Sequence, residues 1–330
     1  MKNKVISVFL IFFLFVALVT VASAGTETQL THGERLTSGI SFYGNHVFWT
    51  ESAGNDVHAY DLTTGKRIDI DGHAAAGRTH AHGNKVVWTG DMGDAVYMYD
   101  VSTGNETMIA SERRAPTMIA SYRHVPDIYG NYIVYTNSNY SYGQDHKNDG
   151  IYLYDLNTGN ETKIATVHGY PAIYDKTVVW SQADNSGGYD IYMYDRCTHQ
   201  TSIITTTNSS SYESRGLDIY GNVIVWTESG NVYMYDITTH KITPVTKSGN
   251  ATDSAIYGKR IVYTLAIFSG IGDIYMYDIS TTKKTRITTS TNAFKPSIYG
   301  DKIVYVDGKN SKYPDVRDIY LCDLKLKAES

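Results

Sequence analysis

Residues 219–227 read IYGNVIVWT, and this short segment recurs seven times along the 330-residue chain. Each copy has an apolar strand, a tight turn centred on glycine or aspartate, and a second apolar strand that ends in an aromatic residue. The spacing of 37 to 47 residues between turn positions is typical of propeller blades. The copies are FYGNHVFWT at 42, AHGNKVVWT at 81, IYGNYIVYT at 128, IYDKTVVWS at 173, IYGNVIVWT at 219, IYGKRIVYT at 256 and IYGDKIVYV at 298.

A second strand motif alternates with the first. Its copies are VHAYD at 57, VYMYD at 96, IYLYD at 151, IYMYD at 191, VYMYD at 232, IYMYD at 274 and IYLCD at 319. Most copies precede a turn such as TTGK and then a threonine-rich segment whose alternating pattern indicates a half-buried edge strand. Four short strands in every period predict an all-β fold, a seven-bladed β-propeller of four-stranded antiparallel blades.

The two ends of the chain predict how the ring closes. After the last copy of the second motif only Leu324 to Ser330 remain, too few and too charged for a turn and an outer strand. Residues Thr26 to Thr31 resemble the outer-strand segment KTRIT at 284–288. We therefore expect this N-terminal segment to be the outer strand of blade 7, protecting its edge, and residues 25–330 to form a single domain.

The first 24 residues are typical of a secretory leader. Lys2 and Lys4 precede an apolar run from Val5 to Val21, and the small residues Ala22 to Ala24 follow. A signal peptide at 1–24 predicts a secreted or cell-surface protein with no membrane span after cleavage. The alternative is an uncleaved membrane anchor, because an apolar run of this length is near the lower limit for a spanning helix.

Composition narrows the classes of partner and cofactor. The formal charge is −5 and falls to −7 without Lys2 and Lys4, and no block of basic residues could neutralise a row of phosphates, so nucleic acid is not expected as a partner. We also expect a monomer and no cofactor. The two cysteines, Cys197 and Cys322, fall in blades nearly opposite one another, which predicts two free thiols.

One aromatic position recurs five residues after every turn position, and it holds all four tryptophans of the protein. Such a stripe could be a carbohydrate platform. Because propeller sheets pack against neighbours on both faces, core packing is the better interpretation. The residues are Trp49, Trp88, Tyr135, Trp180, Trp226, Tyr263 and Tyr305.

With these motifs, the chain resembles the TolB-like β-propeller repeat family, and more closely the surface and secreted propeller-repeat proteins of Methanosarcina-type archaea. The likeness rests on repeats such as IYGDKIVYV at 298 and DIYMYD at 273, and covers residues 26–323. It implies the propeller fold and an envelope-exposed or secreted module, with little indication of an activity. Blade 2 departs from the pattern, with Thr79 to Gly83 reading THAHG.

Positive side chains gather just before the first strand of several repeats, in loops that open at the mouth of the central channel. A ring of cations there would attract a carboxylate or sulfate, such as that of an acidic glycan or a protein partner at the cell envelope. The alternative is that these are ordinary solvated charges. The candidate ligand-binding residues are Arg78, Arg123, His124, His168, Arg215 and Lys295, with Asp253 as an acidic exception.

Three residues before each turn position, the innermost strands carry small or polar side chains, which suit the crowded channel wall. Among them His80, Asp127 and Asp218 could form a metal or acid–base site. These three are the catalytic candidates of an alternative function, a propeller-fold polysaccharide lyase or hydrolase, if they converge. Polar lining with ordered water is the alternative interpretation. The full set is Ser41, His80, Asp127, Ala172, Asp218, Ala255 and Ser297.

Five N-x-S/T triplets fall in expected loops or turns, which makes them candidate glycosylation sites in an organism with the required enzymes. They are Asn105, Asn139, Asn160, Asn208 and Asn250. No serine-hydrolase elbow, zinc-protease helix, phosphate-binding loop or set of zinc-spaced cysteines occurs. The sequence therefore favours a non-catalytic recognition module over an enzyme.

Overall fold

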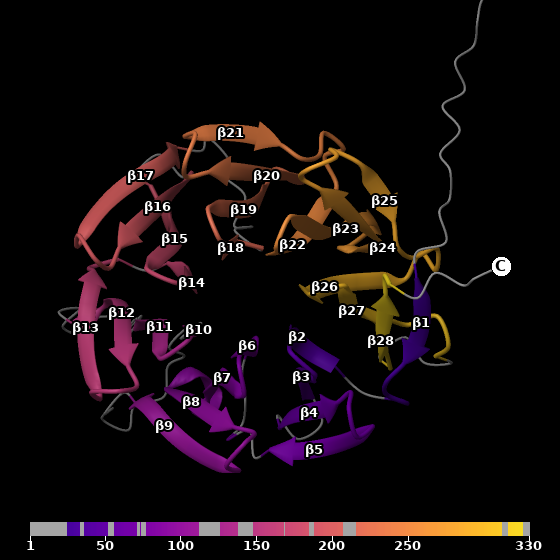
Figure 1. Cartoon of the computed structure of the whole chain (residues 1–330), viewed down its shortest axis with the longest axis horizontal. Helices are drawn as coiled ribbons and strands as arrows, with labels where there is room; N and C mark the ends of the chain where they lie inside the picture. The colour runs from indigo at the N-terminus through magenta and orange to yellow at the C-terminus, as the bar shows by residue number, and fades with distance from the viewer. Residues whose placement is uncertain are drawn as a thin grey trace, which may run out of the picture.

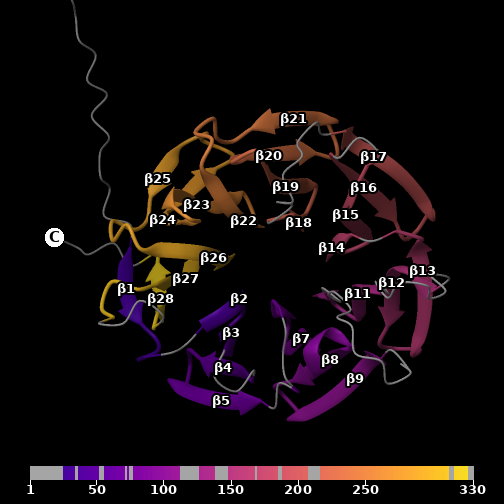
Figure 2. The same ribbon diagram turned by 180° about the vertical axis from the view of Figure 1, so that it is seen from behind.

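The computed structural model is a ring of twisted β-sheets arranged around a central channel, with the first strand of each repeat nearest the centre and the later strands outside it (Figures 1 and 2). The structure describes residues 25–33, 36–51, 56–70, 73, 77–111, 126–137, 148–167, 169–184, 188–206, 216–311 and 316–325. The predicted leader at 1–24 lies outside these residues. No helix in the described ranges is long and apolar enough to cross a membrane.

Five blades are separate four-stranded antiparallel sheets in which the strands follow chain order from the channel outward. A 3-10 turn, η1 (Asp91–Gly93), joins β7 to β8. The blades are β2 (Leu36–Tyr43), β3 (His46–Glu51), β4 (Val57–Asp61) and β5 (Lys66–Ile70); β6 (His80–His82), β7 (Lys85–Gly90), β8 (Ala95–Asp100) and β9 (Asn105–Ser111); β10 (Asp127–Tyr129), β11 (Tyr132–Asn137), β12 (Gly150–Asp155) and β13 (Asn160–Ala165); β14 (Tyr170–Tyr174), β15 (Thr177–Ala183), β16 (Tyr189–Asp195) and β17 (Gln200–Thr206); and β18 (Asp218–Tyr220), β19 (Val223–Glu228), β20 (Asn231–Asp236) and β21 (Lys241–Pro244).

The prediction of seven four-stranded blades is wrong, because the structure has five such blades and one continuous sheet of eight strands. A single antiparallel pair, Gly272 with Ala293, joins β24 to β26. This pair connects the strands β22 to β25 with the strands β26 to β28 and β1, so that they form one sheet. Repeat counting identifies strands but carries no signal for a bridge between them. The eight strands are β22 (Ala251–Tyr257), β23 (Arg260–Phe268), β24 (Ile271–Asp278), β25 (Lys284–Arg286), β26 (Ala293–Tyr299), β27 (Lys302–Asp307), β28 (Asp318–Asp323) and β1 (Thr26–Gln29).

The N-terminal strand β1 forms the edge of this eight-stranded sheet, beside the last strand of the chain (Figure 1). It pairs antiparallel with β28 from Thr26 opposite Asp323 to Gln29 opposite Tyr320. The residues beyond its end continue the contact through side chains, since the Thr31 hydroxyl accepts a hydrogen bond from the Ile319 amide at 2.9 Å. The two ends of the described chain are therefore held together by both backbone and side-chain bonds.

The aromatic position of the second strand lies in the core, as predicted. Its seven side chains are at most 3% exposed and each stacks near the aromatic residue of the third strand, with ring centroids 5.6 to 6.0 Å apart. In the first repeat the partner of Trp49 is His58 rather than tyrosine. Cys197 is exposed, Cys322 is buried, and both are free thiols. The second and third strands of each repeat are thus joined by cross-strand aromatic pairs.

Candidate functional site

The innermost strands build the wall of the central channel. Side chains alternate along a strand, so residues one and three positions before each turn point to the same side. In the structure these two sets of side chains, together with residues between them, line a cavity of about 250 Å³. The channel therefore has an aromatic layer next to the turns and a polar layer one step deeper.

The aromatic layer is a closed ring of seven side chains, which we call the aromatic ring. Neighbouring ring centroids are 4.4 to 4.7 Å apart, and each plane is turned by 47 to 52° from the next. These angles match an equal rotation about the channel axis at every step. The members are Tyr43, His82, Tyr129, Tyr174, Tyr220, Tyr257 and Tyr299.

Three phenols of the aromatic ring, those of Tyr43, Tyr174 and Tyr257, have raised pKa values. Burial is the main cause that raises the pKa of Tyr43 to about 12, and the neighbouring Tyr299 adds to the effect. Burial and interactions with neighbouring phenols also raise the pKa values of Tyr174 and Tyr257 above the usual tyrosine value. Around neutral pH these hydroxyls can therefore both donate and accept hydrogen bonds.

His82 is the only ring member that is not a tyrosine. Its Nδ1 accepts a hydrogen bond from the Gly130 amide at 3.1 Å, and its Nε2 lies 3.3 Å from the Tyr43 hydroxyl. Burial lowers the pKa of His82, so the imidazole is neutral at pH 7. With Nδ1 accepting, the neutral ring carries its proton on Nε2 and donates it to Tyr43.

The two carboxylates of the polar layer bind the backbone of the next repeat. Asp127 accepts the Ile128 amide at 2.8 Å with one oxygen and the Ile173 amide of β14 at 2.8 Å with the other. Asp218 makes the same pair of bonds to Ile219 at 2.8 Å and to Ile256 of β22 at 2.9 Å. Both carboxylates thus have a structural role, linking innermost strands that have no shared ladder.

The three catalytic candidates converge only in part. His80 Nδ1 lies 3.2 Å from Asp127 Oδ1, whereas Asp218 belongs to a strand two repeats further round the ring. In the part of the chain that the structure describes, no three histidine, cysteine, aspartate or glutamate side chains are grouped to hold a metal ion. The His80–Asp127 pair can orient an imidazole, but a third member is not in place.

Asp218 should make folding stability depend on pH. Burial, with repulsion from Asp127, raises its pKa to about 6 in the folded state, against the usual 3.8. Between these values the folded protein binds more protons than the unfolded chain, so this group makes stability fall as pH rises from about 4 to 6. We expect Asp218→Asn to remove that contribution, which urea denaturation at pH 4, 5 and 6 would measure. An identical pH slope in both proteins would contradict the assignment.

The mouth of the channel holds two of the six predicted ligand-binding residues. Arg78 and Lys295 both lie five positions before their turns, at the end of the channel away from the aromatic ring. The Arg78 guanidinium lies 3.4 Å from Asp253, a residue at the equivalent position on the far side of the channel. The predicted Arg123, His124, His168 and Arg215 lie outside the described residues.

Three of the five glycosylation candidates are described, and all three are exposed. Asn105 and Asn160 are the first residues of β9 and β13, directly after turns. Asn250 precedes β22, and its side-chain amide donates to the Ala266 carbonyl. The other two, Asn139 and Asn208, lie outside the described residues.

The aromatic ring and a second polar cluster were not predicted from the sequence. The signal for the ring was present, since an aromatic residue precedes every turn position, but it was interpreted as part of a strand–turn motif. The second cluster lies beside a surface cavity of about 540 Å³ on the first blade, where His58 contacts Glu51 at 3.1 Å and Asp69 at 2.9 Å. The sequence signal for this cluster is His58 in VHAYD at 57, since the other copies of the motif have tyrosine at this position.

Comparisons with known proteins identify the fold and no family. No protein-family profile and no curated protein matches the chain, so the narrower likeness to archaeal surface repeats has no support. The β-propeller domain of the Trilobed protease from Pyrococcus furiosus is similar in structure, with a TM-score of 0.62, 11% identity, and coverage of 89% of this chain and 95% of that one. That propeller is described as having an open velcro topology.

Two further solved structures are also similar to the chain. An oligogalacturonate lyase in complex with manganese has a TM-score of 0.57 and 14% identity, covering 92% of this chain and 94% of that one. TolB from Acinetobacter baumannii has a TM-score of 0.49 and 17% identity, covering 86% and 78%. Identities this low show the fold alone. The chain is thus similar in fold to β-propellers, among them an oligogalacturonate lyase and the propeller domain of a protease.

Proposed function

We propose that the chain is a secreted or cell-surface recognition module without catalytic activity, which binds an acidic glycan or the carboxylates of a partner protein at the channel mouth. The observation that carries the proposal is the position of Arg78, held across the mouth by Asp253 at 3.4 Å. An arginine at a concave opening is well suited to bind carboxylates, because its planar fork can donate two parallel hydrogen bonds.

The mouth is shaped so that Arg78 can occupy it. A Cβ atom added to Gly39, in the neighbouring innermost strand, would lie 2.5 Å from the Arg78 Cα atom. Gly216 likewise passes close to the Ser254 backbone, at 2.5 Å for an added Cβ. Gly39 therefore leaves the space through which Arg78 passes, and Gly216 leaves space for Ser254, the residue after Asp253.

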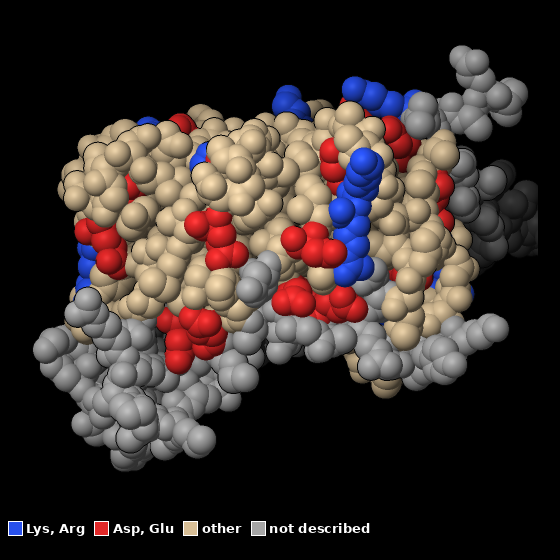
Figure 3. Space-filling view, turned by 90° about the horizontal axis from the view of Figure 1, so that it is seen from below, with Lys and Arg blue, Asp and Glu red and all other residues tan. Residues whose placement is uncertain are grey.

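The Arg78–Asp253 pair is the contact with which an acidic ligand must compete. The Arg78 side chain is 35% exposed and that of Asp253 is 12% exposed, so the guanidinium is reachable from solvent while the carboxylate is shielded. Lys295 lies at the equivalent position in another repeat and adds a positive charge to the same rim. Charges on the outer side of the ring are mixed, with acidic and basic groups interspersed (Figure 3).

Two substitutions at the mouth should have opposite effects on anion binding. We expect Arg78→Ser to weaken binding to polygalacturonate about tenfold, because the main donor is lost. Asp253→Asn should strengthen binding several-fold, because it removes the competing carboxylate and keeps the side-chain size. Affinity should fall as salt exceeds about 0.15 M, where the Debye length is about 8 Å.

Titration calorimetry with polygalacturonate at low salt would measure both effects, with melting temperatures recorded as a control for folding. A change of affinity in the same direction for both variants, or no binding of any polyanion by the wild-type protein at low salt, would contradict the proposal.

The secreted location has its own test, which is the identity of the N-terminal residue of the exported protein. This residue should be Gly25 if the leader is removed after Ala24.

The second candidate function is that of a propeller-fold polysaccharide lyase or hydrolase. The observation in its favour is the His80–Asp127 pair at 3.2 Å inside the channel. His80→Ala should then abolish turnover of an acidic polysaccharide, with or without added manganese, while leaving binding at the mouth intact. Absence of turnover by the wild-type protein under both conditions would remove this candidate.

A further inference from the structure

The interior of the channel is acidic, in contrast to its mouth. Among the described residues that line the cavity are the carboxylates of Asp127 and Asp218, and there is no lysine or arginine. The imidazole of His80, also in the lining, faces Asp127. An anionic ligand at the mouth would therefore not be drawn further into the channel, and the interior favours a ligand of the opposite charge.

Asp218 in particular lacks a positive partner among the described residues. Its two oxygens accept the Ile219 and Ile256 amides, and the other charges that act on it are the repulsive Asp127 and the more distant His80. Burial and the second carboxylate raise its pKa to about 6, so the ionised form is held at a cost. Because buried charges are normally paired, a cation in the cavity would relieve this imbalance.

The aromatic ring provides a second, independent feature that suits a cation. Seven centroids at 4.4 to 4.7 Å from their neighbours lie about 5 Å from the axis, so the aromatic ring encloses the channel on every side. The phenol oxygens are also hydrogen-bond acceptors, and the raised pKa values of Tyr43, Tyr174 and Tyr257 keep these groups protonated. A group on the axis thus meets acceptors on all sides.

The size and ligand set of the cavity favour an organic cation over a metal ion. A volume of about 250 Å³ corresponds to about eight water molecules, far more than a bare ion needs. Structural and catalytic metal sites use three or four protein ligands, and no such group exists among the described residues. A primary ammonium group has three N–H donors, which match carboxylate and phenol acceptors.

We propose that the channel binds a small primary amine, with its ammonium group between the Asp127 and Asp218 carboxylates and the aromatic ring. The alkyl part extends along the side of the cavity lined by Ala255 and Ser297, where the wall carries small side chains. This site is separate from the anion site at the mouth, because it depends on Asp218 and not on Arg78. Either proposal can fail while the other holds.

Titration calorimetry with n-butylammonium chloride, together with the ultraviolet difference spectrum of tyrosine, tests the site directly. We expect saturable binding by the wild-type protein, a loss of at least tenfold in Asp218→Asn, and a several-fold loss in Tyr220→Phe, which keeps both carboxylates. Asp278→Asn is the matched control, since it removes the same charge at the end of β24, outside the cavity lining, and it should bind as wild type does.

Two further measurements distinguish a primary amine from other cations. Tetramethylammonium chloride, which has no N–H donor, should bind at least tenfold more weakly than n-butylammonium. Binding of n-butylammonium should weaken as pH falls through about 6, because Asp218 then takes up a proton, with Asp127, His80, His82 and the ring phenols facing the same space.

Equal binding by tetramethylammonium, or affinity for n-butylammonium unchanged in Asp218→Asn, would overturn the assignment. So would the lack of any tyrosine difference spectrum in the wild-type protein. If Asp218→Asn fails to fold, Tyr220→Phe decides the question, since wild-type affinity in that variant would place the amine outside the ring.

Discussion

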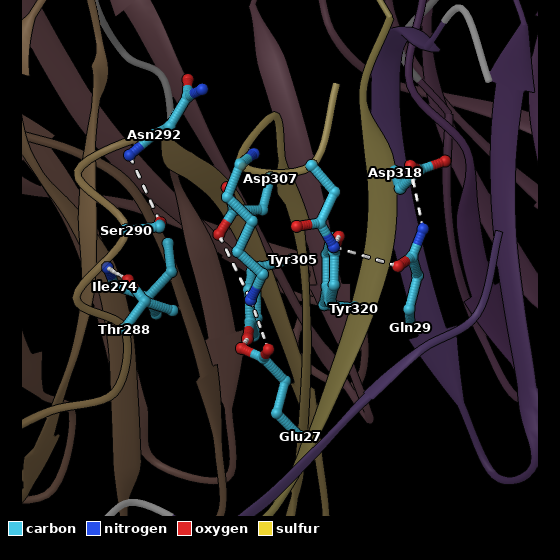
Figure 4. A network of polar contacts seen from close by, with 12 residues as sticks. Glu27, Gln29, Ile274, Thr288, Ser290, Asn292, Tyr305, Asp307, Asp318 and Tyr320 are labelled. Carbon is cyan, nitrogen blue, oxygen red and sulfur yellow. Dashed lines mark hydrogen bonds and ion pairs between the residues drawn. The ribbon is translucent and has the colours of Figure 1, made fainter. Parts of the chain in front are cut away.

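Replacing Asp318 with alanine is expected to lower the free energy of unfolding by about 3 kcal/mol, one of the largest effects of any single polar substitution in this chain. Asp318 is 6% exposed and is the residue at which the N-terminal segment is fastened to β28. Its oxygens accept bonds from the Gln29 side chain at 3.0 Å (Figure 4), and from the Thr31 hydroxyl at 3.2 Å and the Gly33 amide at 2.6 Å. Alanine would leave these donors without their acceptor.

The same arrangement occurs between adjacent strands of one repeat, which shows that it is a property of the repeat. Asp273 lies in β24, directly before Ile274. Its carboxylate accepts hydrogen bonds from the Thr288 hydroxyl at 3.0 Å and from the Thr291 amide at 3.1 Å. The Ile274 amide in turn donates to Thr288 at 2.9 Å (Figure 4), as the Ile319 amide donates to Thr31. The N-terminal segment therefore makes, from nearly 300 residues away, the contacts that an outer strand makes within its own hairpin.

Removal of residues 25–33 provides the control for this prediction. If Asp318 stabilises the fold through the N-terminal segment, the truncation and Asp318→Ala should not be additive, because both remove the same contacts. Additional losses would come from Glu27, which accepts hydrogen bonds from the Tyr305 hydroxyl (Figure 4) and from the Lys309 ammonium. Chemical denaturation of the two single variants and the double variant measures the coupling, and full additivity would refute this role for Asp318.

The sequence predicted the strands well because each repeat carries its own turn and alternation signals. The YG turn, the apolar second strand and the IYMYD strand all lie within a few residues of one another, so local pattern and observed structure agree. The buried aromatic position follows from the same local pattern, with Trp180 and Tyr305 as examples at 2% and 0% exposure. Such features need no knowledge of distant parts of the chain.

The site was predicted less completely because its geometry depends on residues brought together around the ring. The sequence predicted Arg78 as a ligand-binding residue. Its partner Asp253 lies 175 residues away and was interpreted as an acidic exception among the positive residues of the mouth. Asp127 and Asp218 were interpreted as channel lining, yet their bonds to the next strand could not be deduced from their own repeats. The closed aromatic ring likewise appears only when seven separate turns meet.

The second large effect is expected for Gly272→Ala, which should lower the free energy of unfolding by about 3 kcal/mol. Gly272 pairs with Ala293, and this pair joins β24 to β26 in the eight-stranded sheet. An added Cβ would lie 2.0 Å from the Leu265 carbonyl oxygen and 2.9 Å from the Ala266 Cα atom, both backbone atoms of the paired strand β23. Neither atom can move without shifting β23. The contact with Ala293 on β26 should weaken as β24 is displaced.

Gly258→Ala is the matched control, because this turn glycine has a φ of +60° and no atom within 4 Å of an added Cβ. Its cost should be about 1 kcal/mol, from the left-handed backbone alone. The difference between the two variants in chemical denaturation therefore isolates the steric contribution at Gly272. Amide hydrogen exchange should in addition show faster exchange in β24 and β26 for Gly272→Ala, since their bridge is disturbed. Equal stability losses in the two variants would mean that β23 and β24 can separate freely, and the merged sheet would then not depend on the absence of a side chain at this position.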